Sequence, residues 1–270
     1  MEYYYKKTFA HHWEMIISFV EENYSSPEHD NDVLVMHANM LDEEFPRPAG
    51  KIIVYQLEPL VLNQPKSANW WDPIEVIEQL KQADEVWDYD LDNIKILKEH
   101  GIDAKYRPLR YTNSLKRIPN DVEKDIDILF FGSQSEYRSK FLKDFTQGYI
   151  HSGNDELSQV YLNLNLVHVY NMFDSKLDEF IARSKIILNL NPFSVEGRQQ
   201  QTRIFYSLIN EKCIMSEVSN RNYFGDCIIQ FKGSQDFGDK VIKLIHLGDW
   251  QKYPTQSYDW DNFVNRRDII

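Results

Sequence analysis

The chain has 270 residues, of which 42% are hydrophobic and 14% are aromatic, so it has enough apolar surface for packed cores and is not wholly disordered. Its formal net charge of −12 at pH 7 argues against an extended nucleic-acid-binding face, but not against a local basic pocket. The two cysteines, Cys213 and Cys227, lie in apolar runs too far apart for a Cys-x-x-Cys unit, which argues against structural zinc and favours buried thiols in a reducing compartment.

Strands and helices alternate through the first half of the chain. An amphipathic helix follows Thr8, a second opens at Asp72 and Pro73, and a third ends at Gly101. Short apolar runs typical of strands lie at residues 2–5, 33–36, 51–57, 85–88 and 104–108. This alternation predicts a parallel sheet with crossover helices.

The same alternation restarts after a polar segment at residues 112–125. Strands are predicted at residues 126–131, 166–170, 185–190, 213–215 and 227–231, with helices between them. We therefore expect an α/β protein of two Rossmann-like domains whose parallel sheets face each other across a cleft. The expected parts are an N-terminal domain at 1–122, a C-terminal domain at 123–250, and a helix within 251–270 that packs back toward the first domain.

Candidate anion-binding residues follow the strands of the second half. Gly132 and Ser133 form a small turn, rich in N–H groups, that leads from a strand into a helix. Arg138 lies one turn into that helix and is able to reach a diphosphate there. Arg203 lies near the start of a later helix, whose free N–H groups and dipole favour an anion. Each has a structural alternative: an ordinary strand–helix turn, a solvated charge or an ion pair.

Carboxylates and histidines at other strand ends are candidates for different roles. Glu217 closes a buried strand, where it can accept two hydrogen bonds from a ribose diol, with a helix cap or a salt bridge as the alternative. In the first half, Glu58 ends a strand and His11 follows one, so either can orient or deprotonate an acceptor hydroxyl. A purely structural histidine is the alternative for His11. Asp88 and Asp90 open a helix, so N-capping is a simpler interpretation for them than metal binding, and we identify no metal ligands.

Several of these runs, in their order and spacing, resemble small GT-B glycosyltransferases of families 1 and 4, above all those of surface-polysaccharide gene clusters. The runs lie at residues 51–58, 85–89, 125–133, 181–189 and 203–217, with further matching positions at Asn93, Gly101, Ile102, Tyr106 and Arg138. The resemblance implies that the second domain holds a nucleotide-sugar donor and the first holds the acceptor. It also implies transfer without a metal or another cofactor, in which protein cations neutralise the leaving diphosphate.

The sequence departs from that family at one functional element. Many retaining members carry two glutamates eight positions apart, the second of which contacts the donor ribose, whereas Arg198 and Tyr206 occupy those positions here. We therefore include Tyr206 among the candidate donor-binding residues and expect Glu217 to take over the ribose contact. Glu211 occupies the position of the glycine that ends the helix in the family.

We therefore expect a glycosyltransferase that moves a sugar from a nucleotide-sugar donor to a hydroxyl acceptor, most simply a saccharide. One alternative is a phage-type enzyme that glycosylates a hydroxymethylated base in DNA, and another is a non-catalytic nucleotide- or sugar-binding module. The DNA alternative requires a basic strip, for which the candidates are Lys105, Arg107, Arg110, Lys116 and Arg117. Because no apolar run has the length of a membrane span and no signal peptide opens the chain, we expect a cytoplasmic protein, with peripheral attachment to a membrane left open.

Overall fold

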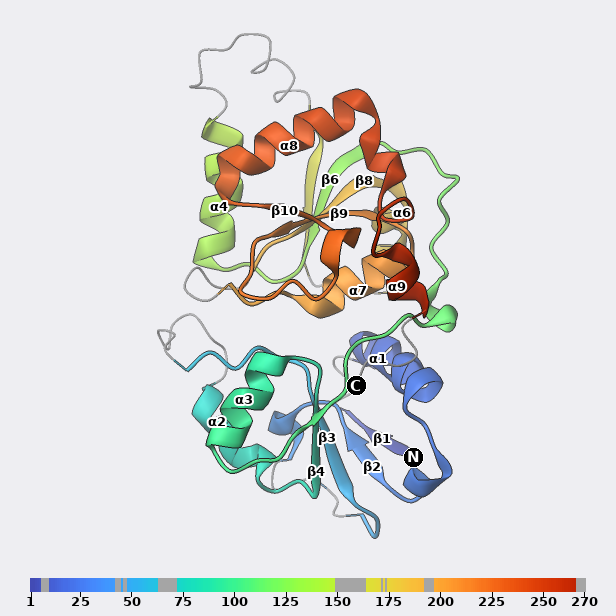
Figure 1. The fold of residues 1–270 in the computed structure, drawn as a ribbon, viewed down its shortest axis with the longest axis vertical. Helices are drawn as coiled ribbons and strands as arrows, with labels where there is room; N and C mark the ends of the chain where they lie inside the picture. Colours follow the sequence, from blue (N-terminus) through green and yellow to red (C-terminus); the bar gives the residue numbers. More distant parts are fainter. Residues whose placement is uncertain are drawn as a thin grey trace. The chain divides into compact units, whose positions relative to one another are not determined.

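A computed structural model of the chain divides it into two compact units, Met1–Ser114 and Leu115–Ile270 (Figure 1). It describes residues 1–5, 10–41, 45, 48–62, 72–148, 164–170, 172, 174–191 and 197–265, without the side chains of 10–13, 39, 146–148 and 174. The division falls earlier in the chain than the boundary expected at 122. The reason is that residues 117 and 118 are bound to the second unit, because their backbone N–H groups both donate to Oδ1 of Asn210 at 2.9 Å.

The first unit is built on a five-stranded parallel sheet in the order β1-β2-β3-β4-β5. Its strands are β1 (Glu2–Tyr4), β2 (Val33–Val35), β3 (Ile52–Gln56), β4 (Glu85–Asp88) and β5 (Lys105–Tyr106). Its helices are α1 (Ala10–Asn23), α2 (Pro73–Leu80) and α3 (Leu91–Glu99), with short 3-10 turns at Pro27–His29 and Ala38–Met40. A further 3-10 turn, Asn113–Leu115, includes the division between the units. Asp90 caps α3 by accepting a hydrogen bond from the N–H of Asp92 at 2.9 Å, which confirms the N-capping interpretation of that residue.

An aromatic cluster forms the centre of the first unit. Tyr55 of β3 and Trp87 of β4 are fully buried neighbours in register, with ring centroids 6.2 Å apart. Phe19 of α1 stacks 6.3 Å from Tyr55, and Tyr24 lies edge-on to Trp87 at 5.8 Å. Rings of this size bury much apolar area, so the cluster fixes α1 against the sheet.

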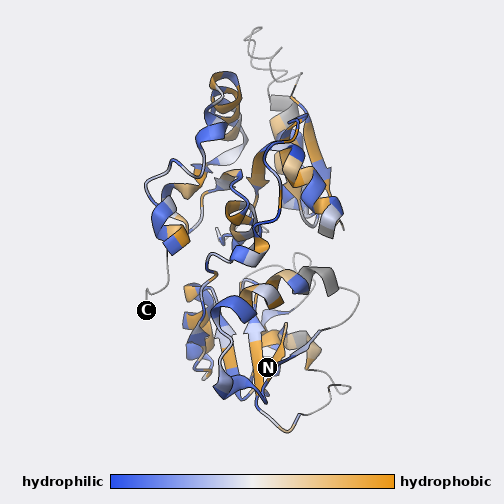
Figure 2. Ribbon diagram, turned by 90° about the vertical axis from the view of Figure 1, so that its right-hand side faces the viewer, coloured by the Kyte–Doolittle hydropathy of each residue, from blue (hydrophilic) through white to orange (hydrophobic). Residues whose placement is uncertain are grey.

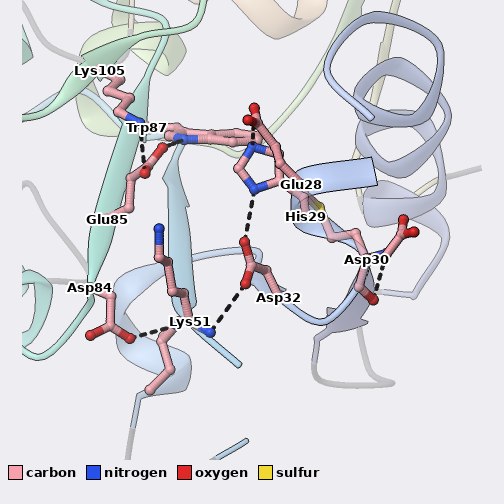
Figure 3. Close-up of polar contacts among 11 residues, drawn as sticks. Glu28, His29, Asp30, Asp32, Lys51, Asp84, Glu85, Trp87 and Lys105 are labelled. Atoms are coloured by element: carbon pink, nitrogen blue, oxygen red, sulfur yellow. Dashed lines mark hydrogen bonds and ion pairs between the residues drawn. The ribbon is translucent and has the colours of Figure 1, made fainter. Parts of the chain in front are cut away.

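Carboxylates bind the amino ends of these strands, as Figure 3 shows. Asp32 accepts a hydrogen bond from the N–H of Lys51 at 3.2 Å, and Asp84 accepts one from the N–H of Ile52 at 2.8 Å. The ring of His29 lies 2.8 Å from Asp32, and this contact is the largest cause of a lowered pKa at Asp32. This edge is opposite to the carboxyl ends of the strands, so we interpret the cluster as structural.

The second unit contains a five-stranded parallel sheet in the order β10-β9-β8-β6-β7. Its strands are β6 (Ile126–Phe131), β7 (Leu166–Val169), β8 (Ser184–Asn189), β9 (Cys213–Glu217) and β10 (Ile229–Phe231). Its helices are α4 (Glu136–Gly148), α6 (Asp174–Arg183), α7 (Gln201–Ile209), α8 (Gly233–Leu247) and α9 (Trp260–Asn265), with 3-10 turns at Gly225–Cys227 and Asp249–Lys252. Two parallel five-stranded sheets confirm the predicted α/β fold class.

Helices cover both faces of this sheet. One face forms a hydrophobic core with α4 and α8, in which Phe141 and Phe237 pack with strand residues such as Phe130 and Met215. Helices α6 and α7 contact β6, β8 and β9. Figure 2 shows how hydrophobic residues concentrate in the strands, as expected for a parallel sheet that is buried on both sides.

The C-terminal segment contains a 3-10 turn at Asp249–Lys252 and then α9, which lies within the range 251–270 where a helix is expected. Its described part packs within the second unit, where Phe263 of α9 lies 6.1 Å from the ring of Phe224 and the N–H of Asp226 donates to Asp259 at 3.0 Å. None of the helices described has both the length and the apolar character needed to cross a membrane.

Candidate functional site

The strand order places a topological switch point between β6 and β8. The chain leaves β6 toward β7 on one side, and leaves β8 toward β9 on the other. In open parallel sheets, ligands bind outside the carboxyl ends of the strands at such a point, because the two connections diverge there. Gly132 and Ser133 follow β6 directly, Asn191 lies just after β8, and α4 and α7 provide Arg138 and Arg203.

Arg203 connects the two strand ends at this switch point. Its Nε donates to the carbonyl of Phe131 at 2.7 Å, and its Nη1 donates to Oδ1 of Asn189 at 2.7 Å. Its guanidinium carbon lies 5.2 Å from the ring centroid of Phe130, within the range of a cation–π contact. Only 9% of the residue is exposed. Arg203 therefore lies at the carboxyl edge of the sheet, and its guanidinium is held in one orientation.

Gly132 leaves room for that guanidinium. Its φ of +143° lies in a region that L side chains rarely adopt. A Cβ at this position would meet Nη2 of Arg203 far inside van der Waals distance and would lie 3.3 Å from its Cζ. The glycine is required here both by the backbone conformation and by the close approach of Arg203.

Arg138 fixes the two loops of the switch point. Its Nη1 donates to the carbonyl of Ser133 at 2.9 Å and to the Ser133 hydroxyl at 3.0 Å. Its Nη2 donates to the carbonyl of Leu190 at 3.0 Å, and its Nε donates to that of Asn191 at 3.2 Å. The residue is only 3% exposed, so its charge acts on the site from beneath the loops.

The two arginines give this edge a positive potential. Burial is the main cause that lowers the pKa of Arg203, and the positive charge of Arg138 lowers it further. Within the part of the chain that the structure describes, Arg203 forms no ion pair with a carboxylate. Cations held in a dry, rigid setting interact more strongly with an anion than they do in water.

Glu217 lies at the same edge, at the end of β9. Its carboxylate accepts a hydrogen bond from the Tyr137 hydroxyl, and its Oε2 accepts one from the N–H of Asn191 at 3.1 Å. Burial raises the pKa of Glu217, while the bonds from Tyr137 and Asn191 and the charge of Arg138 act in the opposite direction. The structure therefore brings Gly132, Ser133, Arg138, Arg203 and Glu217 together around one switch point.

Tyr206 lies elsewhere, and the structure does not bring it together with those residues. Its hydroxyl donates to Asp178 of α6 and accepts a hydrogen bond from Nε of Arg117 at 3.0 Å. Arg117 and Asp178 form an ion pair at 2.9 Å and line a pocket of about 750 Å³ beside Ala182 and Asp125, at the amino ends of β8 and β6. Tyr206 thus binds the segment after Ser114 to α6.

The two acceptor-side candidates belong to the first unit. Glu58 follows β3, and its carbonyl accepts hydrogen bonds from Nε2 of Gln56 at 3.0 Å and Nδ2 of Asn93 at 2.9 Å. Its side chain is partly exposed at the carboxyl edge of the sheet, where a ligand is expected to bind. His11 lies in the first turn of α1, but its side chain is outside the described residues.

Sequence reasoning missed three polar residues of the switch point. Asn189, fully buried at the end of β8, binds Arg203, while Tyr137 and Asn191 bind Glu217. A polar residue at the end of an otherwise apolar strand was an available signal for Asn189. No local signal marked Tyr137, because its role depends on how α4 packs beside β9.

The candidate basic strip for DNA is engaged within the protein. Lys105 pairs with Glu85 at 2.7 Å, Lys116 pairs with Glu211, and Arg117 pairs with Asp178. The guanidinium carbons of Arg107 and Arg110 lie 5.2 Å and 5.5 Å from the ring of Tyr24. Among the described residues, no group of three or more His, Cys, Asp or Glu side chains is arranged to hold a metal ion.

Solved structures with a similar fold include GT-B glycosyltransferases. Sucrose-phosphate synthase from Thermosynechococcus elongatus has a TM-score of 0.56 and 10% identity, covering 97% of this chain and 76% of its own. Anabaena HepE, solved with UDP and glucose, has a TM-score of 0.54 and 8% identity, covering 87% of this chain and 76% of its own. TarM has a TM-score of 0.52 and 11% identity, and this chain, matched over 87% of its length, spans only 54% of TarM.

The chain therefore has the GT-B fold, as the sequence resemblance implied. At 8–11% identity these similarities concern the fold alone. No protein-family model matches the sequence, and no curated protein matches it. The function must consequently be argued from the residues of the site.

Proposed function

We propose that this protein is a glycosyltransferase that moves a sugar from a nucleotide-sugar donor to a hydroxyl of a saccharide acceptor. The observation that carries this proposal is the pair of buried arginines at the switch point of the second sheet, one of which approaches a glycine too closely for any Cβ. The GT-B fold supports it, because the similar structures are glycosyltransferases and HepE was solved with UDP and glucose.

In this proposal the donor diphosphate lies over the loop of Gly132 and Ser133, close to Arg203. Negative charge grows on the leaving diphosphate as the glycosidic bond breaks, and a fixed cation lowers the energy of that state without reorganising. Arg138 holds the two loops in place and adds its charge from below. Protein cations then perform the role that a divalent metal has in metal-dependent transferases.

Glu217 is proposed to bind the donor ribose, since its position at the end of β9 adjoins the switch point. An ionised carboxylate can accept both hydrogen bonds of a ribose diol. We assign orientation or deprotonation of the acceptor hydroxyl to Glu58 or His11 of the first unit. Peripheral association with a membrane is compatible with this assignment, and a cytoplasmic location is its simplest setting.

The test is nucleotide release from a panel of UDP-, GDP- and CMP-sugars, first without and then with saccharide acceptors. We expect Arg203→Ala to lose about two orders of magnitude or more in turnover, and Arg203→Lys to recover only part, because it keeps the charge but not the planar fork. Arg183→Ala is the matched control, since Arg183 pairs with Asp125 at the opposite edge of the same sheet. Wild-type turnover by Arg203→Ala would refute the mechanism, and silence across the panel would favour a non-catalytic binding module.

A further inference from the structure

Asn189 has no assigned role in the proposal above, yet it is fully buried at the switch point. Its Oδ1 accepts the hydrogen bond from Nη1 of Arg203 at 2.7 Å, and its Nδ2 donates to the hydroxyl of Ser216 at 3.0 Å. The Ser216 hydroxyl in turn donates to the carbonyl of Glu217 at 3.2 Å. Asn189 therefore orients Arg203 and connects it to the end of β9.

The neutral amide of Asn189 is the notable feature of this contact. An aspartate has nearly the same shape and would give Arg203 a buried counter-charge at the same distance, which would relieve much of the cost of burying the guanidinium. The protein instead uses a side chain that provides the hydrogen bond without a charge. Because the described residues provide no ion pair to Arg203, its charge remains available to a ligand.

Two side-chain donors near the start of α7 have no partner among the described residues. The N-cap residue of α7, Gln200, provides no side-chain cap. Gln199 and Gln201 are each only 2% exposed, and their Nε2 atoms are buried without a hydrogen-bond partner. Buried donors without partners are costly.

We propose that Asn189 is a positioning residue that aims Arg203 while leaving its charge to be neutralised by the ligand. The ligand class is a polyanionic phosphate of the pyrophosphate type, and its binding is thereby coupled to the stability of the second unit. This inference rests on the proposed function, since it assigns the same site to the donor diphosphate. Because Asn189 is neutral, the charge of Arg203 favours a negatively charged ligand.

The test is Asn189→Asp in the full chain, measured at pH 8 by thermal shift and by titration with inorganic pyrophosphate. We expect two effects of opposite direction. Without ligand, the melting temperature of the second unit rises, because the buried guanidinium gains a counter-charge. The affinity for pyrophosphate falls roughly 100-fold, as expected for one negative charge a few ångströms from a bound anion at an effective dielectric constant of about 20.

Two control variants separate charge from structure. Asn189→Leu removes the hydrogen bond to Arg203 but adds no charge, so we expect a lower melting temperature and a smaller loss of pyrophosphate affinity than Asn189→Asp shows. Asn165→Asp adds the same charge at the exposed amino edge of the sheet, and we expect it to leave the affinity for pyrophosphate near wild type. A purely structural role for Asn189 predicts that Asn189→Asp binds pyrophosphate as wild type does, and this result would overturn the inference.

Pyrophosphate binding is measured without turnover, so the outcome is distinct from that of the transferase assay. A protein that transfers no sugar but shows the opposed effects of Asn189→Asp retains the anion site and loses only the proposed reaction. A protein that transfers sugar while Asn189→Asp binds pyrophosphate normally retains the reaction and loses the inference. Uridine, which has the base and ribose but no phosphate, should give no comparable stabilisation.

Discussion

The contact between Gly132 and Arg203 provides the sharpest test of the site geometry. Gly132→Ala places a Cβ far inside van der Waals distance of Nη2 of Arg203, at a φ of +143°. The unfavourable backbone conformation costs roughly 1–3 kcal/mol. The guanidinium must also move away from the carbonyl of Phe131 and from Asn189, and each hydrogen bond to a charged group is worth about 1.5–3 kcal/mol. We expect the second unit to lose at least about 3 kcal/mol of stability, given that the displaced side chain recovers part of these contacts.

A double-mutant cycle separates the cost of the backbone conformation at Gly132 from the cost of displacing the guanidinium of Arg203. In an Arg203→Ala background the space beside Gly132 is free, so Gly132→Ala costs only the backbone term. The cycle should therefore give a coupling energy of about 2 kcal/mol, with the double variant more stable than the sum of the single effects predicts. Hydrogen exchange of peptides from β6 and β8 is the suitable measurement, because it reports the second unit separately from the first.

Gly248→Ala is the matched control for this cycle. Gly248 also has a positive φ, +69°, but a Cβ there would meet nothing within 4 Å. Its substitution should cost only about 1 kcal/mol, as expected for the left-handed region, and should show no coupling to Arg203→Ala. Additive effects of Gly132→Ala and Arg203→Ala would refute the close approach, and with it the argument that this glycine makes room for the guanidinium.

Three further predictions concern titratable groups. Burial lowers the pKa of Lys212 from 10.5 to about 7, so the unfolded chain binds more protons than the folded one between these pH values. The free energy of unfolding of the wild type should therefore rise from pH 7 to pH 10.5, and urea unfolding of Lys212→Met should lack this pH dependence. Asp32→Asn should cost the first unit about 1–3 kcal/mol at pH 7. Because His29 lowers the pKa of Asp32, this difference should vanish in acid unfolding curves as the pH falls through that pKa. Tyr137→Phe removes a bond that lowers the pKa of Glu217, so the KM for the donor should begin to rise at a higher pH than in wild type as the solution is acidified.

The alternation of strands and helices was readable from the sequence because both sheets are parallel and buried. Runs such as residues 126–131 and 185–190 are mainly apolar, and the turns between elements carry glycine, proline or asparagine. This local information was sufficient for the fold class. It also placed Gly132, Arg138 and Arg203 near the carboxyl ends of strands, since the end of a strand is a local property.

The contacts of the site were not readable, because they depend on strand order. No local pattern predicts that β6 lies between β8 and β7. This strand order brings Arg138 and Arg203 to one switch point. The partners of Glu217 likewise come from α4 and from the loop after β8, which are 80 and 26 residues away in the chain. Single motifs therefore identify candidate site residues but not the side chains that contact them.

The placement of Tyr206 argues against a ribose contact at this position of α7. In the resembling family a glutamate at this position of the helix reaches the donor ribose, but here the hydroxyl of Tyr206 lies between Arg117 and Asp178. Because this hydroxyl binds both members of the Arg117–Asp178 ion pair near the amino ends of β8 and β6, it is not placed to accept hydrogen bonds from a diol at the carboxyl edge of the sheet. Of the carboxylates described, Glu217 is the one bound to a loop of the switch point, through the N–H of Asn191. If this chain binds a ribose through a carboxylate of the second unit, the contact has moved from the helix to the end of β9.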